Sequence, residues 1–197
     1  MRVIGGNARG RRLKVPRGRS LRPTAARVKE ALFDILPHDL SGLRVLDLFA
    51  GTGNVTIEAL SRGAEAATLV DASVESGRAI RDNLRRLGLS DRAHLLIAPV
   101  ERALRQLARR HETFELIFVD PPYGRRLVER TFKIIAQGDI LCDSGVAVAE
   151  HGVRDHVADR FGELALRDRR RYGDTMLSFF EWQRVENSEA RNPANGT

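Results

Sequence analysis

Short apolar runs of four to six residues recur through the middle of the chain. They occupy residues 44–49, 67–70, 94–97, 116–119 and 146–149. The segments between them place apolar residues at the spacing of amphipathic helices. These segments are 55–62, 74–87, 100–109 and 126–137. Strands that are apolar on both faces and alternate with helices are typical of a parallel sheet covered on both sides. The pattern therefore predicts an α/β fold.

The pattern differs before this alternating region. Residues 2–15 mix short apolar and basic stretches around glycines, which predicts a small, exposed β-hairpin or extended arm. A helix is expected next, with Thr24 as its cap and Pro37 closing it. Its apolar positions are Val28, Leu32 and Ile35.

The pattern also differs after residue 145. Residues 164–166 and 176–180 are typical of strands joined without a helix, which predicts an antiparallel pair at one edge of the sheet. Residues 183–197 are polar, with Asn-Pro and Asn-Gly pairs, so we expect a disordered tail. The chain would then divide into an arm (1–22), a domain (23–182) and this tail.

Length and composition exclude several classes of protein. A chain of 197 residues can bury a sizeable core without metal or disulfides. It has no apolar run of about 18 residues, which excludes a transmembrane helix. The basic N-terminus lacks the apolar stretch of a secretory signal. A single cysteine, Cys142, excludes an internal disulfide and fits a reducing cytoplasm.

The charge is unevenly distributed. The chain carries 33 basic and 26 acidic residues, for a net charge of +7. Residues 1–29 hold eight Arg, two Lys and no acid, so this segment carries +10 and the remainder −3. An arginine-rich proteome would explain Arg over Lys, but not the absence of acids from 29 residues. The asymmetry indicates a polyanion-binding arm on an ordinary globular domain.

The first apolar strand runs into a glycine turn, Asp47-Leu48-Phe49-Ala50-Gly51-Thr52-Gly53-Asn54. Nucleotide ligands of doubly wound sheets lie at this turn, and Gly51 and Gly53 let the backbone approach them. A dinucleotide would need a third glycine, where Thr56 stands, and Asp47 would repel its pyrophosphate. The carboxylate instead attracts the ammonium and sulfonium of S-adenosylmethionine.

A second acid, Asp71, ends the second strand, 24 residues after Asp47. An acid at that place can accept hydrogen bonds from both ribose hydroxyls of a nucleoside. Two structural interpretations stay open: Asp47 caps a helix, and Asp71 is an ordinary loop acid. Together with the glycine turn, the two acids favour an S-adenosylmethionine site.

The fourth strand leads into Asp120-Pro121-Pro122-Tyr123. Two consecutive prolines make this turn rigid. The Asp120 side chain and the carbonyls of Asp120 and Pro121 can converge on both hydrogens of an exocyclic amine, which aims its lone pair at the sulfonium methyl. Tyr123 can stack on the base. The alternative is a purely structural proline turn in which the aspartate caps a helix.

These motifs resemble the RsmD-type methyltransferases, which modify guanine N2 in bacterial small-subunit ribosomal RNA. The similarity spans residues 1 to about 182. The stretch most specific to this family is Arg22-Pro23-Thr24 followed by Arg27-Val28-Lys29-Glu30-Ala31-Leu32-Phe33. The D-P-P-Y loop is shared with many amino-methyltransferases of DNA, RNA and protein. The other matching stretches are Arg9–Arg11, Asp47–Gly53, Glu58–Ala64 and Tyr172–Thr175, with Leu177 and Phe179.

The resemblance implies a Rossmann-like class I methyltransferase fold, with a seven-stranded, mostly parallel sheet, an antiparallel last strand and an N-terminal hairpin arm. It implies S-adenosylmethionine as cofactor and a guanine N2 in 16S ribosomal RNA of the assembling small subunit as target. Ribosomal proteins are further partners of what we expect to be a cytoplasmic monomer.

The expected site residues fall into three sets. The catalytic set is Asp120, Pro121, Pro122 and Tyr123. The cofactor-binding set is Asp47, Phe49, Gly51, Gly53, Asn54, Asp71, Ala72 and Val100. The RNA-binding set is Arg9, Arg11, Arg12, Lys14, Arg17, Arg19 and Arg22. No metal site is expected, because the five histidines are scattered without the spacing of metal ligands.

Some assignments stay open. Relatives usually carry an acid after the third strand that contacts the cofactor's adenine, where this chain has Ile97-Ala98-Pro99-Val100-Glu101. Glu101 or a backbone acceptor are the alternatives. Glu150 either lines the base pocket or is structural. The cluster of Arg167 and Arg169–Arg171 either extends the RNA surface or, by default, is a solvated charge run.

Two rival functions stay open as well. A DNA adenine-N6 methyltransferase would use the same loop chemistry, but it usually needs a separate target-recognition region for which this chain has little room. A non-catalytic ribosome-assembly or RNA-binding factor could keep the fold. The intact Asp120–Tyr123 loop speaks against that reading.

Overall fold

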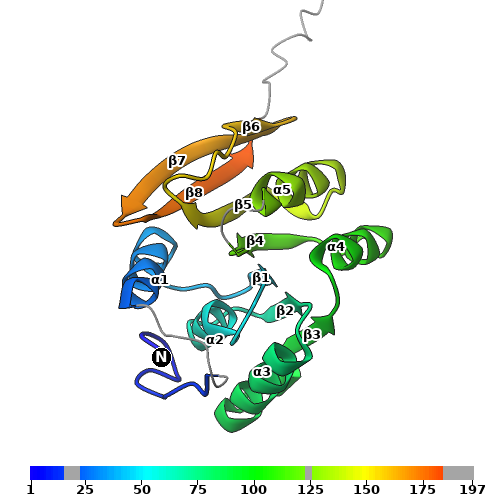
Figure 1. Cartoon of the computed structure of the whole chain (residues 1–197). Coiled ribbons are helices and arrows are strands. Elements are labelled where there is room, and N and C mark those ends of the chain that lie inside the picture. The colour runs from blue at the N-terminus through cyan, green and yellow to red at the C-terminus, as the bar shows by residue number, and fades with distance from the viewer. Residues whose placement is uncertain (16–22, 123–125, 184–197) are drawn as a thin grey trace, which may run out of the picture.

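Eight strands form one sheet in the part of the chain that the computed structural model describes, residues 1–15, 23–122 and 126–183 (Figure 1). The strands are β1 (Arg44–Leu48), β2 (Ala66–Asp71), β3 (Ala93–Ile97), β4 (Phe114–Val119), β5 (Leu141–Gly152), β6 (Arg160–Phe161), β7 (Leu164–Tyr172) and β8 (Thr175–Trp182). Their order is β3-β2-β1-β4-β5-β8-β7-β6. The five strands from β3 to β5 pair in parallel, and β8 pairs antiparallel with both β5 and β7.

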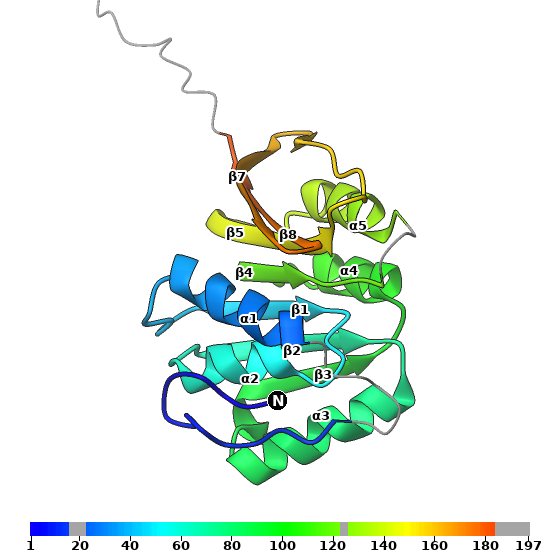
Figure 2. The ribbon, with the colours of Figure 1, turned by 60° about the vertical axis from the view of Figure 1, so that its left-hand side comes forward.

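Five α-helices in the described residues cover the two faces of this sheet (Figure 2). They are α1 (Pro23–Ile35), α2 (Asn54–Ser61), α3 (Val74–Leu87), α4 (Val100–Arg109) and α5 (Leu127–Gln137). Successive strand residues face opposite sides, so Val45 joins the core under α1, α2 and α3, whereas Leu46 joins the core under α4 and α5. This arrangement explains why the strands are apolar on both faces.

The alternating pattern predicted these elements closely, and the α/β class with an antiparallel last strand is confirmed. The bounds of α3 and α4 coincide with those expected. The resemblance implied seven strands, and the eighth is the two-residue β6, too short for a periodic signal. β5 begins five residues earlier than expected, because its first half is partly polar and passes a register irregularity opposite β4.

The first helix differs from expectation at its start. It begins at Pro23, so Thr24 lies inside its first turn and is not the residue before the helix. Proline suits a first turn because its missing N–H has no helical partner there. The helix ends at Ile35, two residues before Pro37, as the backbone restriction ahead of a proline favours.

The N-terminal residues form a hairpin-like loop that is docked on the domain. Leu13 N–H donates to the Met1 carbonyl (3.0 Å) and Val3 N–H to the Arg11 carbonyl (3.0 Å). The expectation of an exposed arm is wrong for its apolar side chains, because Val3 and Leu13 are buried in the core with α1 and α2. The proposed boundary at residue 22 falls in residues 16–22, outside the described part.

The expected tail lies outside the described residues except for Gln183, whose N–H donates to the Glu163 carbonyl (2.9 Å). No helix of the described residues is long and apolar enough to cross a membrane.

Candidate active site

The turn after β1 adopts backbone conformations that favour glycine. Gly51 and Gly53 have φ of 61° and 72°. A Cβ on Gly53 would stand 3.2 Å from the Leu69 side chain of β2, so the turn lies close against the sheet. Gly53 is also the N-cap of α2, where it offers no capping side chain. The start of α2 must therefore be bonded from elsewhere.

Asp47 of β1 supplies that bond. Its Oδ2 accepts a 2.7 Å hydrogen bond from Thr56 Oγ1, and the Thr56 backbone N–H also donates to the carboxyl. Asp47 is 2% exposed, and this burial raises its pKa to about 7 even though both Thr56 bonds lower it. The bond to Thr56, in the first turn of α2, favours the interpretation of Asp47 as a helix-capping acid. Its role toward a cofactor stays a prediction.

Asp71 closes the glycine turn from the end of β2. Its Oδ2 accepts the Gly51 N–H (2.8 Å) and its Oδ1 accepts the Ser73 N–H (2.8 Å). Each carboxylate oxygen has a second lone pair. The carboxylate can therefore hold the turn and still accept two further hydrogen bonds, as a pair of ribose hydroxyls would require.

The other predicted cofactor residues surround the same turn. Phe49 is half-buried at a φ of 66°, Asn54 is the first residue of α2, and Ala72 is exposed directly after β2. Val100 begins α4 and is buried. The two Asp71 oxygens beside Gly51 and Gly53, together with the buried acid on β1, fit a nucleoside with a cationic tail.

The segment after β3 leaves the adenine contact open. The Ala98 N–H donates to the Asp71 carbonyl (3.1 Å), which ties the end of β3 to the end of β2. Pro99 is the N-cap of α4, and Glu101 is half-buried in the first turn of that helix. Both alternatives, Glu101 and a backbone acceptor, remain.

The proline loop lies beside the glycine turn. The Asp120 N–H donates to the Leu48 carbonyl (3.3 Å), so the loop that leaves β4 is bonded to the last residue of β1. Asp120 is half-buried, Pro121 is buried and Pro122 is exposed. Tyr123 lies outside the described residues. The adjacent ends of β1 and β4 are the point where the strand order reverses, which is where open α/β sheets bind ligands.

A pocket opens next to the two prolines. It is lined by Pro121, Pro122, Arg126, Leu127, Val128, Glu129, Glu150, His151, Asp155, His156 and Val157. Glu150 therefore lines this pocket, and that the pocket receives the base stays a prediction. The strand register carries a signal for this, because Val119 pairs with Ala149, which puts Asp120 and Glu150 at the next position of neighbouring strands.

His151 is a pocket residue that the sequence did not single out. Its Nε2 lies 2.9 Å from Ser178 Oγ, its Nδ1 lies 3.1 Å from the Gly152 carbonyl, and Arg169 Nε donates to the same Ser178 oxygen (2.9 Å). Burial lowers the pKa of His151, which favours the neutral ring. A neutral ring with its proton on Nδ1 satisfies all of these contacts, so His151 supports the pocket wall.

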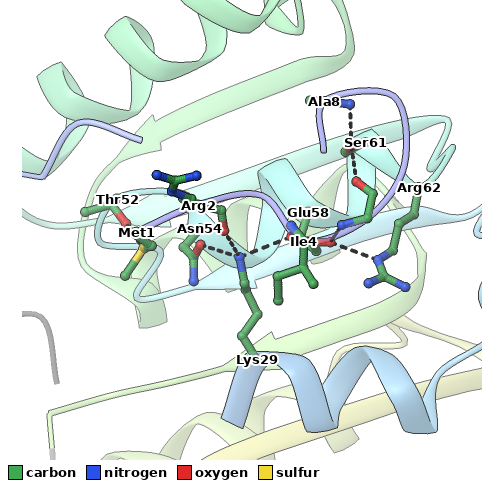
Figure 3. Close-up of polar contacts among 11 residues, drawn as sticks. Met1, Arg2, Ile4, Ala8, Lys29, Thr52, Asn54, Glu58, Ser61 and Arg62 are labelled. Carbon is green, nitrogen blue, oxygen red and sulfur yellow. Dashed lines mark hydrogen bonds and ion pairs between the residues drawn. The ribbon is translucent and has the colours of Figure 1, made fainter. Parts of the chain in front are cut away.

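The N-terminal loop is anchored by two buried charges (Figure 3). Glu58 of α2 accepts the N–H groups of Ile4 (2.8 Å) and Gly5 (2.7 Å), and Lys29 of α1 donates to Glu58 (3.1 Å). Arg62 Nε donates to the other Glu58 oxygen (3.0 Å). The signal for a buried Lys29 was its place three and four residues before the buried Leu32 and Phe33, on the apolar face of α1.

The predicted RNA-binding residues are only partly described. Arg9, Arg11, Arg12 and Lys14 are exposed, whereas Arg17, Arg19 and Arg22 lie outside the described residues. Lys14 Nζ pairs with Asp82 of α3 (3.0 Å), and Arg11 donates to the Arg86 carbonyl (3.2 Å). The loop thus presents its basic side chains beside α3.

Three of the four arginines of the second basic cluster, on β7, pair with acids, and the fourth, Arg171, donates to the Gly173 carbonyl (2.8 Å). Arg169 pairs with Asp159 (3.0 Å), Arg170 pairs with Asp168 (2.7 Å), and Arg167 pairs with Glu181. This pairing favours the default interpretation, a solvated charge run. Within residues 1–15, 23–122 and 126–183, no group of three His, Cys, Asp or Glu side chains could hold a metal ion.

Comparisons with known proteins agree with these features. The family model described as "Conserved hypothetical protein 95" matches residues 1–181. The chain is 37% identical to the putative rRNA methyltransferase YlbH of Bacillus subtilis, over 92% of this chain and 98% of that protein. It is 36% identical to ribosomal RNA small subunit methyltransferase D of Escherichia coli, over 79% and 76%. A solved structure described as the putative methyltransferase yhhF from Escherichia coli superposes with a TM-score of 0.78 at 32% identity, over 93% and 99%.

Proposed function

Since the chain belongs to the family of RsmD-type methyltransferases, the one whose model is described as "Conserved hypothetical protein 95", we propose that it methylates the exocyclic N2 of a guanine in 16S ribosomal RNA with S-adenosylmethionine. One observation carries the proposal. The bond from Asp120 N–H to the Leu48 carbonyl holds the proline loop beside the glycine turn. A methyl donor at the turn and an amine at the loop would then be neighbours.

The cofactor supplies a methyl group on a positively charged sulfur. Gly51 and Gly53 let the backbone come close to it, and Asp71 accepts hydrogen bonds from its ribose. The buried carboxyl of Asp47, when ionised, attracts the cationic tail of the cofactor. Apolar contacts come from Phe49, Ala72 and Val100, and Asn54 lies at the start of α2.

The proline loop holds the target amine. The Asp120 carboxylate and the carbonyls of Asp120 and Pro121 accept both N–H bonds, and Tyr123 stacks on the base. The amine of a guanine is conjugated with the ring and is a poor nucleophile, so its orientation and the acceptors around it are the main contribution of the protein. The amine's proton leaves to Asp120 or to water after methyl transfer.

The distribution of charge along the chain supports the N-terminal arm as the RNA-binding surface. Residues 1–22 form the RNA-recognition arm, residues 23–182 the methyltransferase domain, and residues 183–197 a tail. The arm has no acid to repel phosphate. Arg9, Arg11 and Arg12 of the arm are exposed and no acid pairs with them in the described residues, whereas Arg167, Arg169 and Arg170 of β7 are paired with acids.

Labelled methyl transfer tests this function. The purified chain is incubated with methyl-labelled S-adenosylmethionine and either small subunits from a strain lacking the corresponding gene or plasmid DNA. We expect label in 16S ribosomal RNA as N2-methylguanosine and none in DNA. Label in adenine of the plasmid would favour the DNA enzyme, and binding of subunits with no label would favour a non-catalytic assembly factor.

A further inference from the structure

Lys29 connects three parts of the molecule through one buried ammonium group (Figure 3). Only 4% of the residue is exposed. Its Nζ donates to the Arg2 carbonyl (2.7 Å), to Asn54 Oδ1 (2.9 Å) and to Glu58 Oε2 (3.1 Å). An ammonium has three protons, so its capacity is used completely. One bond goes to the N-terminal loop, one to the glycine turn and one to the body of α2.

Glu58 allows the Lys29 ammonium group to be buried. It is 0% exposed, and burial would raise its pKa. The Ile4 N–H, the Lys29 charge and the Arg62 hydrogen bond outweigh burial and lower that pKa, so Glu58 is ionised and balances Lys29. Two of the donors that satisfy Glu58 are backbone N–H groups of the N-terminal loop, at Ile4 and Gly5. The charge pair is therefore complete only when this loop is docked.

A second set of contacts joins the loop to the glycine turn. The buried amide of Asn83 donates to the carbonyls of Lys14 (3.0 Å) and Thr52 (3.2 Å) and accepts the Lys14 N–H (2.8 Å). The Thr52 hydroxyl donates to the Met1 sulfur (3.5 Å). Both ends of the N-terminal loop thus share partners with residues 52–54 of the turn.

The bond from Lys29 to Asn54 is the informative one. Anchoring the loop does not need a bond from Lys29 to Asn54, because Glu58 accepts the Ile4 and Gly5 N–H groups and Arg62 already gives that carboxylate a cation. The bond to Asn54 instead extends the network to the first residue of α2, next to Gly53 at the N-cap. Undocking the loop would remove two donors from Glu58 and one acceptor from Lys29, and would leave the buried ammonium that also holds Asn54 incompletely bonded.

We propose that Lys29 is a positioning residue through which the docked N-terminal loop holds the glycine turn in its cofactor-binding geometry, so that RNA binding by the loop and cofactor binding by the turn strengthen each other. The inference rests on the proposed function. Linkage requires the effect to be reciprocal, with the same factor in both directions. An RNA that binds only the docked loop raises cofactor affinity, and a bound cofactor raises RNA affinity.

The test measures binding and not turnover. The dissociation constant of S-adenosylhomocysteine is measured by calorimetry with and without small subunits from a strain lacking the corresponding gene, which supply the RNA. For the wild-type chain we expect RNA to tighten binding by about fivefold or more, the lower end of usual coupling energies. Hydrogen exchange with S-adenosylhomocysteine alone should slow at the Ile4 and Gly5 amides, which lie outside the cofactor turn.

The key variant is the double substitution Lys29→Met with Glu58→Gln, because it removes both members of the buried pair and still leaves an oxygen for Arg62 and for the loop amides. We expect weaker binding without RNA, loss of the RNA effect and loss of the exchange protection. Lys29→Met alone should act in the same direction if it folds. The matched control is Ser61→Ala, which removes bonds to Gly5 and Ala8 without touching residues 51–54, and it should keep the RNA effect.

The outcomes separate this inference from the proposed function. Binding that RNA leaves unchanged in the wild type, or an RNA effect that survives in the double variant, overturns the coupling while the methyltransferase assignment stands. A lowered melting temperature with intact binding and coupling would make Lys29 merely structural. Absence of any S-adenosylhomocysteine binding to the wild type would overturn both.

Discussion

The Thr56 hydroxyl donates a 2.7 Å hydrogen bond to the Asp47 carboxylate, and neither residue is more than 2% exposed. Burial outweighs this bond and raises the pKa of Asp47 to about 7. One of the two acids expected at the cofactor site therefore changes charge near neutral pH when no cation is beside it.

Folding stability should report this shift. The folded pKa of Asp47 lies above its unfolded value, so between about pH 4 and pH 7 the folded state binds more protons, and stability falls as pH rises. Asp47→Asn keeps an oxygen for Thr56 but cannot ionise. Its free energy of unfolding, relative to wild type, should improve by about 2.5 kcal/mol between pH 5 and pH 8, at about 1.4 kcal/mol for each pH unit below the folded pKa. Urea unfolding measures it, and a difference that is constant with pH would contradict the pKa.

Cofactor binding should show the opposite dependence. A cation beside Asp47 favours the ionised carboxyl, so S-adenosylmethionine should bind more weakly as pH falls below 7, by up to about tenfold per pH unit. Asp47→Asn should bind weakly with a flat profile, while Asp71→Asn should weaken binding at every pH. Calorimetry from pH 6 to pH 8 compares the three. A sloping profile in Asp47→Asn would assign the titration to another group.

Much of this site could be predicted from the local sequence. Asp71 and Asp120 are visible as acids at which an apolar run stops, and Asp47 interrupts the run that leads into the glycine turn. In a parallel sheet the ends of such strands meet at one edge. Lys29 was different. Its place on the apolar face of α1 is a local signal for burial, but the carboxylate that balances its charge, Glu58, is 29 residues away and is not visible in the local pattern.

The pocket wall was hidden for a similar reason. Glu150 and His151 lie beside the prolines only because β5 pairs with β4 and β8 pairs with β5, which long-range register decides. The docking of Val3 and Leu13 is likewise a tertiary effect. Their basic neighbours suggested exposure, but α1 and α2 leave an apolar surface for them.

The proline loop should be essential to chemistry and not to cofactor binding. Asp120→Ala removes one acceptor for the amine and should lower kcat by about 100-fold or more, the usual cost of losing one charge-stabilising contact. Its dissociation constant for S-adenosylhomocysteine should stay within twofold of wild type. Asp120→Asn keeps a carbonyl oxygen and should retain measurable turnover. Single-turnover methylation of small subunits measures both variants, and full activity in Asp120→Ala would remove the loop from the mechanism.

RNA binding should depend on the N-terminal loop more than on β7. Arg9→Ala with Arg12→Ala removes two exposed charges, each able to neutralise a phosphate, so the slope of log affinity against log salt should fall by about one per lost contact. The matched control, Arg167→Ala with Arg170→Ala, removes two charges that are already paired with Glu181 and Asp168, and should change the slope little. Filter binding of 16S ribosomal RNA from 50 to 300 mM salt gives both slopes. Equal losses in the two double variants would place the RNA across β7 as well, and an unchanged slope in the loop variant would remove the loop from RNA recognition.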